Sequence, residues 1–400
     1  MKNNSNTKRG LFILHEGINS TIFNSQVLEH VLALKKKGIH FDILSFNTEN
    51  KIWKKSVLNK QKVNKQFPSI NIYLFKSINI FYPFAFIIHS FSLLKFLYSS
   101  KVKYDFIHSR SDYTQFISLI TKKIHKINSV WDCRGHSISE IFFSLKKKNL
   151  IYKIYGNLYI LPLFRTIIKY NSRKSDGIIF ISENLKFEIN KISKRIIRNI
   201  IIVPCLVNEK LFYFEASLRA ESRKRLKIEQ SQTVFIYSGS MVAYQSIEIQ
   251  KKLYKKILSD KNNILVILTN HIKEAELLFE KIKSKRFKIF SSEFNKINEY
   301  FNLADFSILI RNNEKLNYVA SPTKFGEYCM SGLPVIMNNT VKQAFDNSKK
   351  IGNYFDWNNT DFKKCSDSIR KTVSKKSQIY YSRKIYIDIY KVFYFNTIKN

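Results

Sequence analysis

Short apolar runs alternate with segments of helical periodicity along almost the whole chain of 400 residues. Strands that are buried on both faces of a parallel sheet appear as continuous apolar runs, and crossover helices separate them. The predicted strands span residues 11–14, 41–46, 104–110, 129–136, 177–183, 200–204, 234–240, 264–268, 287–290, 306–310 and 333–337. The pattern therefore predicts an α/β fold with two doubly wound domains.

One helix connects the last two predicted strands and is entered through a loop over 311–320. Ser321 is a good N-cap for it, and Pro322 suits the first turn because its missing N–H costs nothing there. Gly332 and Pro334 should end the helix after about three turns. The unit is therefore predicted to run strand, helix, strand.

Three polar side chains share one face of this helix. At helical spacing Lys324, Glu327 and Ser331 lie together, while Phe325 and Cys329 lie on another face. The polar stripe follows the carboxyl end of a parallel strand, where open α/β sheets bind ligands. The helix is a candidate ligand-binding element, although an ordinary capped amphipathic helix would have the same local pattern.

The same stretch resembles the nucleotide-sugar-binding motif of the retaining GT-B glycosyltransferases of family four. In the branch that makes bacterial surface polysaccharides, the motif often reads Ser-Pro-x-Lys-x-x-Glu-Tyr and ends Gly-x-Pro-Val-Ile, as residues 321–328 and 332–336 do. The resemblance implies that Glu327 binds the ribose hydroxyls of the donor. It implies further donor contacts at Ser321, Pro322, Thr323 and Lys324. The family's second glutamate, eight residues earlier, is Val319 here, so no acidic sugar contact is implied at that place.

Two glycine turns and a polar loop complete the donor-binding set that the resemblance implies. Gly17 and Gly239 each follow a predicted strand, where a backbone without Cβ can approach a ligand closely. Ser240 and Gln245 stand where much of the family has an Arg and a Lys for the donor diphosphate. Because two phosphates need compensating charge, Lys324 is the candidate replacement. Gly17 also fits an ordinary strand-to-helix turn, and the dinucleotide fingerprint Gly-x-Gly-x-x-Gly does not occur.

The predicted strand at 129–136 carries Asp132, Arg134 and His136 at its end. In the family a strand of the type Asp-x-Arg-Gly or Asp-x-His-Gly ends at the cleft, so the resemblance implies that these three residues are catalytic. An N-cap or a salt bridge would also explain Asp132, and a solvated loop would explain His136. A helix with aromatic and basic residues is predicted at 145–169.

The resemblance covers almost the whole chain and implies the GT-B architecture, two Rossmann-like domains that face each other across a cleft. Residues 1–205 would form the acceptor-side domain, 206–370 the donor domain, and 371–400 a helical tail that crosses back to the first. The implied reaction moves a sugar from a nucleotide-diphosphate sugar to a glycan or lipid-linked acceptor, with retention, in the synthesis of capsule, O-antigen or lipopolysaccharide. Asp-x-Asp, which holds the metal of GT-A enzymes, does not occur, so we expect neither a metal nor another cofactor.

Net charge widens the list of partners. The chain carries +38 at pH 7, which favours nucleic acid or an anionic membrane surface. Lys, Asn, Ile, Phe and Tyr are abundant together, as AT-rich coding produces, and no arginine-rich run or nucleic-acid module signature occurs, so nucleic acid is not expected. An uncharged segment at 77–94 is interpreted as a buried or interfacial helix. Scattered cysteines and the absence of an apolar leader favour the cytoplasm, with peripheral binding at the inner face of the cell membrane.

Other functions stay open. A nucleotide-sugar epimerase could use the same fold, because a fold does not fix the chemistry. A non-catalytic protein that binds nucleic acid or a membrane surface would need a continuous basic face with stacking aromatics, whereas the positive charge here is spread through both halves. An inactive relative is a further alternative, given Val319, Ser240 and Gln245.

Overall fold

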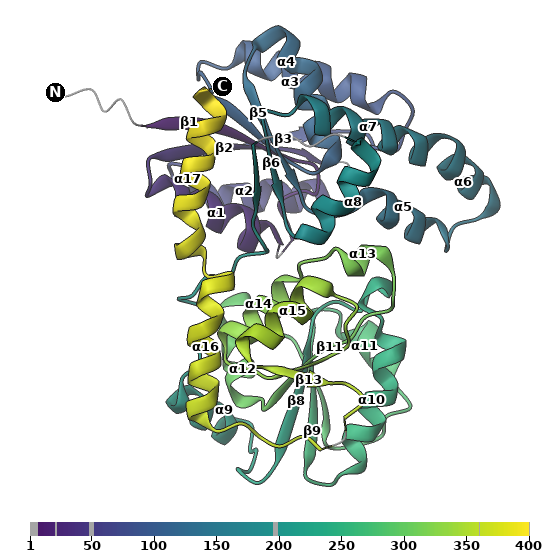
Figure 1. Cartoon of the computed structure of the whole chain (residues 1–400), viewed down its shortest axis with the longest axis vertical. Helices are drawn as coiled ribbons and strands as arrows, with labels where there is room; N and C mark the ends of the chain where they lie inside the picture. Colours follow the sequence, from purple (N-terminus) through teal and green to yellow (C-terminus); the bar gives the residue numbers. More distant parts are fainter. Residues whose placement is uncertain (1–6, 21, 48–51, 195–198, 360, 400) are drawn as a thin grey trace, which may run out of the picture. The chain divides into compact units, whose positions relative to one another are not determined.

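The computed structural model describes residues 7–20, 22–47, 52–194, 199–359 and 361–399. Contacts divide the chain into two compact units, Met1–Val203 with Tyr386–Asn400, and Pro204–Ile385. Each unit is built on its own parallel sheet with helices around it (Figure 1), so the predicted fold class is confirmed. Residues 371–385 group with the second unit and 386–400 with the first, where the prediction was a helical tail over 371–400 that crosses back to the first domain.

The first unit contains a seven-stranded sheet in the order β3-β2-β1-β4-β5-β6-β7. Its strands are β1 (Lys8–Leu14), β2 (Ile39–Asn47), β3 (Ile72–Lys76), β4 (Phe106–Arg110), β5 (Asn128–Cys133), β6 (Gly177–Phe180) and β7 (Ile200–Ile202). Its helices are α1 (Glu29–Lys35) after a π-helical turn (Phe23–Leu28), α2 (Trp53–Gln66), α3 (Ala85–Ser99), α4 (Asp112–His125), α5 (Ser137–Leu145), α6 (Leu150–Tyr155), a second π-helical turn (Gly156–Ile160), α7 (Leu161–Lys174), α8 (Glu183–Ser193) and the end of α17 (Arg383–Lys399). The strand order reverses between β1 and β4.

Both faces of the first sheet are covered, which is why most residues of its inner strands are apolar. Leu11 and Ile13 pack with side chains of α3, α4 and α7 on one face. Phe12 faces the other way and stacks on His108, with ring centroids 4.2 Å apart. That second face is covered by α1 and by the end of α17, whose Tyr394 lies against β2 and β4. Alternate residues of β1 therefore belong to two cores on opposite faces of the sheet.

The second unit contains a six-stranded sheet in the order β10-β9-β8-β11-β12-β13. Its strands are β8 (Thr233–Ser238), β9 (Asn263–Leu268), β10 (Phe287–Phe290), β11 (Phe306–Leu309), β12 (Val335–Met337) and β13 (Tyr354–Asp356). Its helices are α9 (Ala216–Arg225), a 3₁₀ turn (Ala243–Gln245), α10 (Ile247–Ser259), α11 (Ile272–Phe279), a 3₁₀ turn (Phe294–Lys296), α12 (Ile297–Leu303), α13 (Lys315–Tyr318), α14 (Thr323–Met330), α15 (Lys342–Ile351) and α16 (Asp367–Tyr381). Here the strand order reverses between β8 and β11.

The second sheet is also buried on both faces. Alternate residues of β8 enter different cores: Val234 and Ile236 pack with α12, α14 and α16, whereas Phe235 and Tyr237 pack with α10 and α11. The apolar face of α14 lies in the first of these cores, as its sequence predicts. Ser331 of the predicted polar stripe is fully buried and donates to Asn298 of α12 at 2.7 Å, so the stripe does not form one ligand-facing surface.

The helix predicted at 145–169 has the wrong bounds. α5 ends at Leu145, and α6, a π-helical turn and α7 then run from Leu150 to Lys174. Asn149 begins the new helix because its side-chain oxygen accepts a hydrogen bond from the Tyr152 N–H at 2.9 Å. Three lysines followed by a capping asparagine therefore break what periodicity alone predicts as one helix.

The uncharged segment at 77–94 is only partly helical. α3 begins at Ala85 and continues to Ser99, because Pro83 is followed by Phe84 in the left-handed conformation, with φ of +60°. Across the described ranges, no helix combines the length and the apolar character needed to cross a lipid bilayer.

The start of α14 differs from our prediction. Pro322, and not Ser321, is the N-cap residue, and the Ser321 hydroxyl oxygen accepts a hydrogen bond from the Cys205 N–H at 3.1 Å. Ser321 therefore ties the start of α14 to the chain that enters the second unit. The predicted loop over 311–320 contains the short helix α13.

The end of α14 also comes earlier, at Met330 after eight residues. Gly332 adopts a left-handed φ of +70°, and the Leu333 N–H turns back to donate to the Tyr328 carbonyl at 2.9 Å. This is the hydrogen-bond pattern of a glycine-terminated helix. The helix has about two turns and not three, because the terminating turn uses residues that periodicity assigns to the helix.

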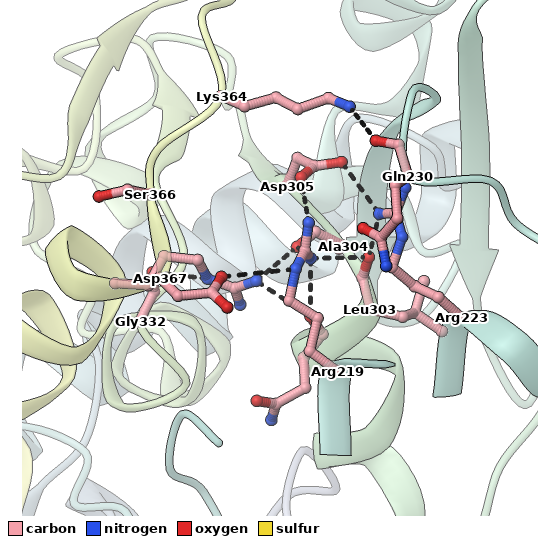
Figure 2. Close-up of polar contacts among 12 residues, drawn as sticks. Arg219, Arg223, Gln230, Leu303, Ala304, Asp305, Gly332, Lys364, Ser366 and Asp367 are labelled. Atoms are coloured by element: carbon pink, nitrogen blue, oxygen red, sulfur yellow. Dashed lines mark hydrogen bonds and ion pairs between the residues drawn. The ribbon is translucent and has the colours of Figure 1, made fainter. Parts of the chain in front are cut away.

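A cluster of arginines satisfies the buried end of α12 (Figure 2). The last carbonyl groups of a helix have no partner within the helix. Arg219, Arg223 and Arg370 donate to carbonyls of residues 301–304. Asp305 accepts from Arg219 at 2.6 Å and from Arg223 at 3.3 Å. Because Asp305 directly precedes β11, this cluster lies at the amino end of that strand, and we interpret it as structural.

Candidate functional site

The second unit brings its polar motif to the point where its strand order reverses. Ligands of open α/β sheets bind outside the carboxyl ends of the strands, at such a point. Gly239 and Ser240 follow β8, Arg311 follows the end of β11, and α14 carries Lys324 and Glu327. The Ser238 N–H at the end of β8 donates to the Tyr328 hydroxyl at 2.8 Å, which holds α14 against that strand end.

Lys324 lies across the glycine turn after β8. Its Nζ donates to Gln245 Oε1 at 2.8 Å and to the Tyr237 hydroxyl at 3.5 Å, and it lies 4.6 Å from the centroid of the Tyr237 ring. Gly239 has a φ of +148°, and a Cβ there would collide with Lys324 Nζ. The sequence therefore needs glycine at this position for the lysine to reach the turn.

Among the described residues, no carboxylate forms an ion pair with the ammonium group of Lys324. Burial lowers the pKa of Lys324 well below its usual value, and the nearby Arg311 lowers it further, while Glu327 opposes the shift. A partly buried cation beside a second cation is stabilised by any anion that enters. The reversal point of the second sheet is therefore suited to a negatively charged ligand.

Glu327 lies one helical turn after Lys324 and is only 8% exposed. Burial raises the pKa of Glu327 to about 7, although Lys324 acts in the opposite direction. Among the described residues, no donor is hydrogen-bonded to its carboxylate. Its two oxygens can therefore accept hydrogen bonds from a ligand that carries hydroxyl groups.

The other predicted donor-binding residues of the second unit, Ser240, Pro322 and Thr323, differ in their exposure and contacts. Ser240 contributes its carbonyl, which accepts a hydrogen bond from the Tyr237 hydroxyl at 3.0 Å. Thr323 and Pro322 are partly exposed at the start of α14. Val319, where the family has a glutamate, is buried.

The first unit has a comparable edge at its own reversal point, between β1 and β4. Gly17 follows β1 after His15 and Glu16, and its φ of +76° requires glycine. Across the β4–β5 ladder Arg110 is paired in register with Asp132. Arg110 Nε lies 3.4 Å from a carboxylate oxygen of Glu16, which links the ends of β1 and β4.

Asp132 is buried beside a histidine and two arginines. Its carboxylate lies 3.3 Å from His108 Nε2, 3.4 Å from Arg134 and 3.7 Å from Arg110. Burial alone would raise its pKa, but Arg134, His108 and Arg110 outweigh that effect and hold the pKa far below its usual value. Asp132 is therefore ionised at neutral pH and has no proton to exchange there. Its negative charge orients the two arginines.

His136 is not a solvated loop residue, as one interpretation had it. It is 4% exposed and is the N-cap of α5, where its Nδ1 accepts from the Ser139 N–H at 3.2 Å and lies 2.7 Å from the Ser139 hydroxyl. Because Nδ1 accepts a hydrogen bond, the neutral ring carries its proton on Nε2.

Sequence reasoning gave no role to Tyr237, Arg311, Glu16 or Arg110. The two arginines and the glutamate lie at or just after the carboxyl end of a strand, and a search for polar residues at those places would have found them. Tyr237 is inside an apolar strand and gives no such signal. Across the described residues, no group of three or more His, Cys, Asp or Glu side chains is placed to hold a metal ion.

Comparison with known proteins defines the fold. No protein-family model matches the chain, and no curated protein matches its sequence. Solved structures match over nearly the full length. Sucrose-phosphate synthase from Thermosynechococcus elongatus has a TM-score of 0.69 at 13% identity, covering 97% of this chain and 98% of that one. WaaG, a glycosyltransferase involved in lipopolysaccharide biosynthesis, has a TM-score of 0.62 at 12% identity, covering 98% and 94%.

A third similar structure contains a bound ligand. Anabaena Alr3699/HepE, solved in complex with UDP-glucose, has a TM-score of 0.62 at 10% identity, covering 97% of this chain and 99% of that chain. With its two parallel Rossmann-like sheets of seven and six strands, this chain has the GT-B fold.

Proposed function

We propose that the protein is a glycosyltransferase whose second unit binds a nucleotide-diphosphate sugar. The observation that carries the proposal is the pair Lys324 and Glu327, one turn apart on α14 beside the reversal of β8 and β11. A diphosphate needs a cation and a ribose needs a hydrogen-bond acceptor. The motif resemblance and the UDP-glucose complex of a protein with the same fold support this assignment.

The proposed chemistry places the departing nucleoside diphosphate against Lys324. Negative charge accumulates on the diphosphate as the sugar leaves, so a fixed cation stabilises the transition state more than the ground state. Retention of configuration, independence of a metal and a catalytic role for Asp132, Arg134 and His136 rest on the resemblance to family four. In that scheme, Asp132 keeps Arg134 and Arg110 in place on the acceptor side.

A screen of nucleotide sugars tests the proposal. At least one should raise the melting temperature, because a ligand that binds only the folded state stabilises it. The same compound should release its nucleoside diphosphate slowly by hydrolysis without an acceptor. A full panel that neither stabilises the protein nor is turned over would refute the proposal, and interconversion of two nucleotide sugars without release would indicate an epimerase.

Glu327 provides a pH test of the ribose assignment. Glu327→Ala should weaken nucleotide binding by about 1.5–3 kcal/mol, the usual loss for a hydrogen bond to a charged group. Because burial raises the pKa of Glu327 to about 7, its ionised form is lost as the pH falls from 8 to 6. Lys324 and Arg311 also face this site, so affinities are compared as a ratio between wild type and Glu327→Gln.

That ratio should be largest at pH 8 and approach one at pH 6, where a protonated carboxyl resembles the amide. Calorimetric titration of the nucleotide at both pH values measures it. A ratio that does not change with pH would show that Glu327 does not bind the ribose.

We further propose that the protein acts in cell-surface polysaccharide synthesis, on a glycan or lipid-linked acceptor at the cytoplasmic face of the membrane. Support comes from a surface of the first unit formed by α6 and the following π-helical turn, where Leu150, Ile151 and Leu158 are 72%, 80% and 77% exposed. Residues 141–175 around it contain eight Lys or Arg and no Asp or Glu. Exposed apolar side chains among basic ones suit an anionic lipid surface.

Replacing Leu150, Ile151 and Leu158 together by serine should reduce co-sedimentation with anionic vesicles at least tenfold, since full burial of each side chain contributes about 1.5–3 kcal/mol. Leu277→Ser, a change of an equally exposed leucine in α11, should have no effect. Binding of the wild type should also weaken as salt rises. Equal binding of both variants would exclude α6 as the lipid contact.

A further inference from the structure

Two cations, one just after β11 and one on α14, hold the turn that follows β8. Lys324 Nζ donates to the side-chain oxygen of Gln245, and Arg311 donates to the backbone carbonyl of Tyr244, both at 2.8 Å. The Asn312 N–H adds a hydrogen bond to the hydroxyl of Ser246, also at 2.8 Å. Residues 244–246 are therefore fastened across the reversal point of the sheet.

Arg311, like Arg370, is a buried arginine that has no carboxylate partner among the described residues, but Arg370 meets five backbone carbonyls and Arg311 meets one. It is 4% exposed, and across the described residues no Asp or Glu lies within ion-pair distance of its guanidinium. Arg110 and Arg223, which are equally buried, each pair with an aspartate. Burial lowers the pKa of Arg311 from its usual value. Its position is fixed, because Asn338 accepts from its backbone N–H at 3.3 Å and donates to its carbonyl at 2.7 Å.

Both cations thus donate to neutral oxygens. A phosphate oxygen adds charge–charge attraction to a cationic donor, which a neutral amide or carbonyl oxygen cannot supply. Among the described residues, Lys324 meets the Gln245 amide oxygen and the Tyr237 hydroxyl, and Arg311 meets the Tyr244 carbonyl. Both cations would gain from exchanging these neutral acceptors for phosphate oxygens. Such an exchange would remove the two side-chain hydrogen bonds that hold Tyr244 and Gln245.

We propose that Arg311 and Lys324 together form the diphosphate receptor, and that the Tyr244 carbonyl and the Gln245 amide oxygen hold its place until a nucleoside diphosphate displaces them. Displacement frees the turn 239–246. The inference rests on the proposed function, since it concerns the same donor. It assigns a binding role to Arg311 and makes Gln245 a competitor of the ligand.

Because Gln245 is proposed to compete with the ligand, removing its side-chain oxygen should strengthen ligand binding. Gln245→Met removes the competing oxygen, so uridine diphosphate and inorganic pyrophosphate should bind the full chain more tightly, by about threefold to tenfold. Gln245→Glu places a carboxylate on Lys324 and should weaken both by about tenfold or more. If Gln245 were instead a direct ligand of phosphate, Gln245→Met would weaken binding, and this result would overturn the proposal.

Arg311→Gln should weaken both probes by at least about tenfold and leave uridine binding unchanged, because the lost partner is a phosphate. Arg225→Gln, which removes a half-exposed arginine paired with Glu299 in the same unit, is the control for net charge and should have little effect. Equal losses in the two variants would mean that Arg311 acts only through long-range charge, and would overturn its assignment.

Hydrogen exchange gives an independent readout. Uridine diphosphate should speed exchange at residues 239–246 of the wild type, because the turn loses two fastenings, and should not do so in Arg311→Gln. Slower exchange throughout the turn would contradict the displacement. If the wild type binds the probes but neither the affinity changes nor the faster exchange occur, this inference is refuted and the proposed function is not. If the wild type binds neither probe, both are refuted.

Discussion

Lys324→Met is expected to lower the rate of donor turnover by about 10²–10³-fold, the cost of removing one preorganised group that stabilises developing charge, or about 2.7–4 kcal/mol. Lys324 is the cation of α14 that reaches the glycine turn after β8, and burial makes its charge depend on an anion beside it. Charge on the leaving diphosphate grows in the transition state, so kcat should fall more than the donor KM rises.

The control for Lys324→Met is Lys342→Met. Lys342 belongs to the same unit but is 40% exposed and pairs with Asp346 at 2.6 Å on the surface of α15, so its loss should leave kcat unchanged. Initial rates of nucleoside diphosphate release for both variants give the comparison. If Lys324→Met also weakened a nucleoside that carries no phosphate, the lysine would be shaping the site and not compensating charge.

Asp305→Asn is expected to lower the free energy of unfolding of the second unit by about 3–5 kcal/mol, the usual cost of breaking a buried ion pair from one side. Asp305 is 3% exposed, pairs with Arg219 and Arg223, and accepts a further hydrogen bond from the Val234 N–H at 2.7 Å. Without its carboxylate, Arg223 keeps only carbonyl partners among the described residues, and Arg219 keeps carbonyl partners and the half-exposed Asp367 (Figure 2).

Asp367→Asn is the matched control. Asp367 lies 3.7 Å from the same Arg219 but its side chain is 53% exposed, so the change should cost less than about 1 kcal/mol. Urea unfolding followed by circular dichroism measures both variants. A small loss for Asp305→Asn, equal to that of the control, would show that the carbonyl groups alone suffice to hold the arginines.

Most strands could be predicted from the sequence, because strands such as β8 and β9 are buried on both faces and are therefore almost entirely apolar. β3, which is partly exposed, was not predicted. Helix ends were harder to predict. The break after Leu145 depends on Asn149 as a cap, and the end of α14 depends on the conformation of Gly332. β13, with its short and half-exposed run Tyr354–Asp356, had no apolar pattern to reveal it.

The candidate site was predictable where the motif is local and not where it depends on the sheet. Lys324 and Glu327 lie on one helix, so spacing alone places them together. Arg311 and Gln245 meet them only because β8 and β11 are neighbours in the sheet, which the chain order does not reveal. His136 shows a further limit, since helix capping and exposure in a loop give the same sequence signal.

A crystal structure of the full chain with the nucleoside diphosphate sugar chosen by the screen tests the central claim most directly. We predict that the ribose hydroxyls lie within hydrogen-bond distance of Glu327, and that the diphosphate lies against Lys324 and the turn at Gly239. Ligand density at any other place in the chain would contradict the assignment of the β8–β11 reversal point as the donor site.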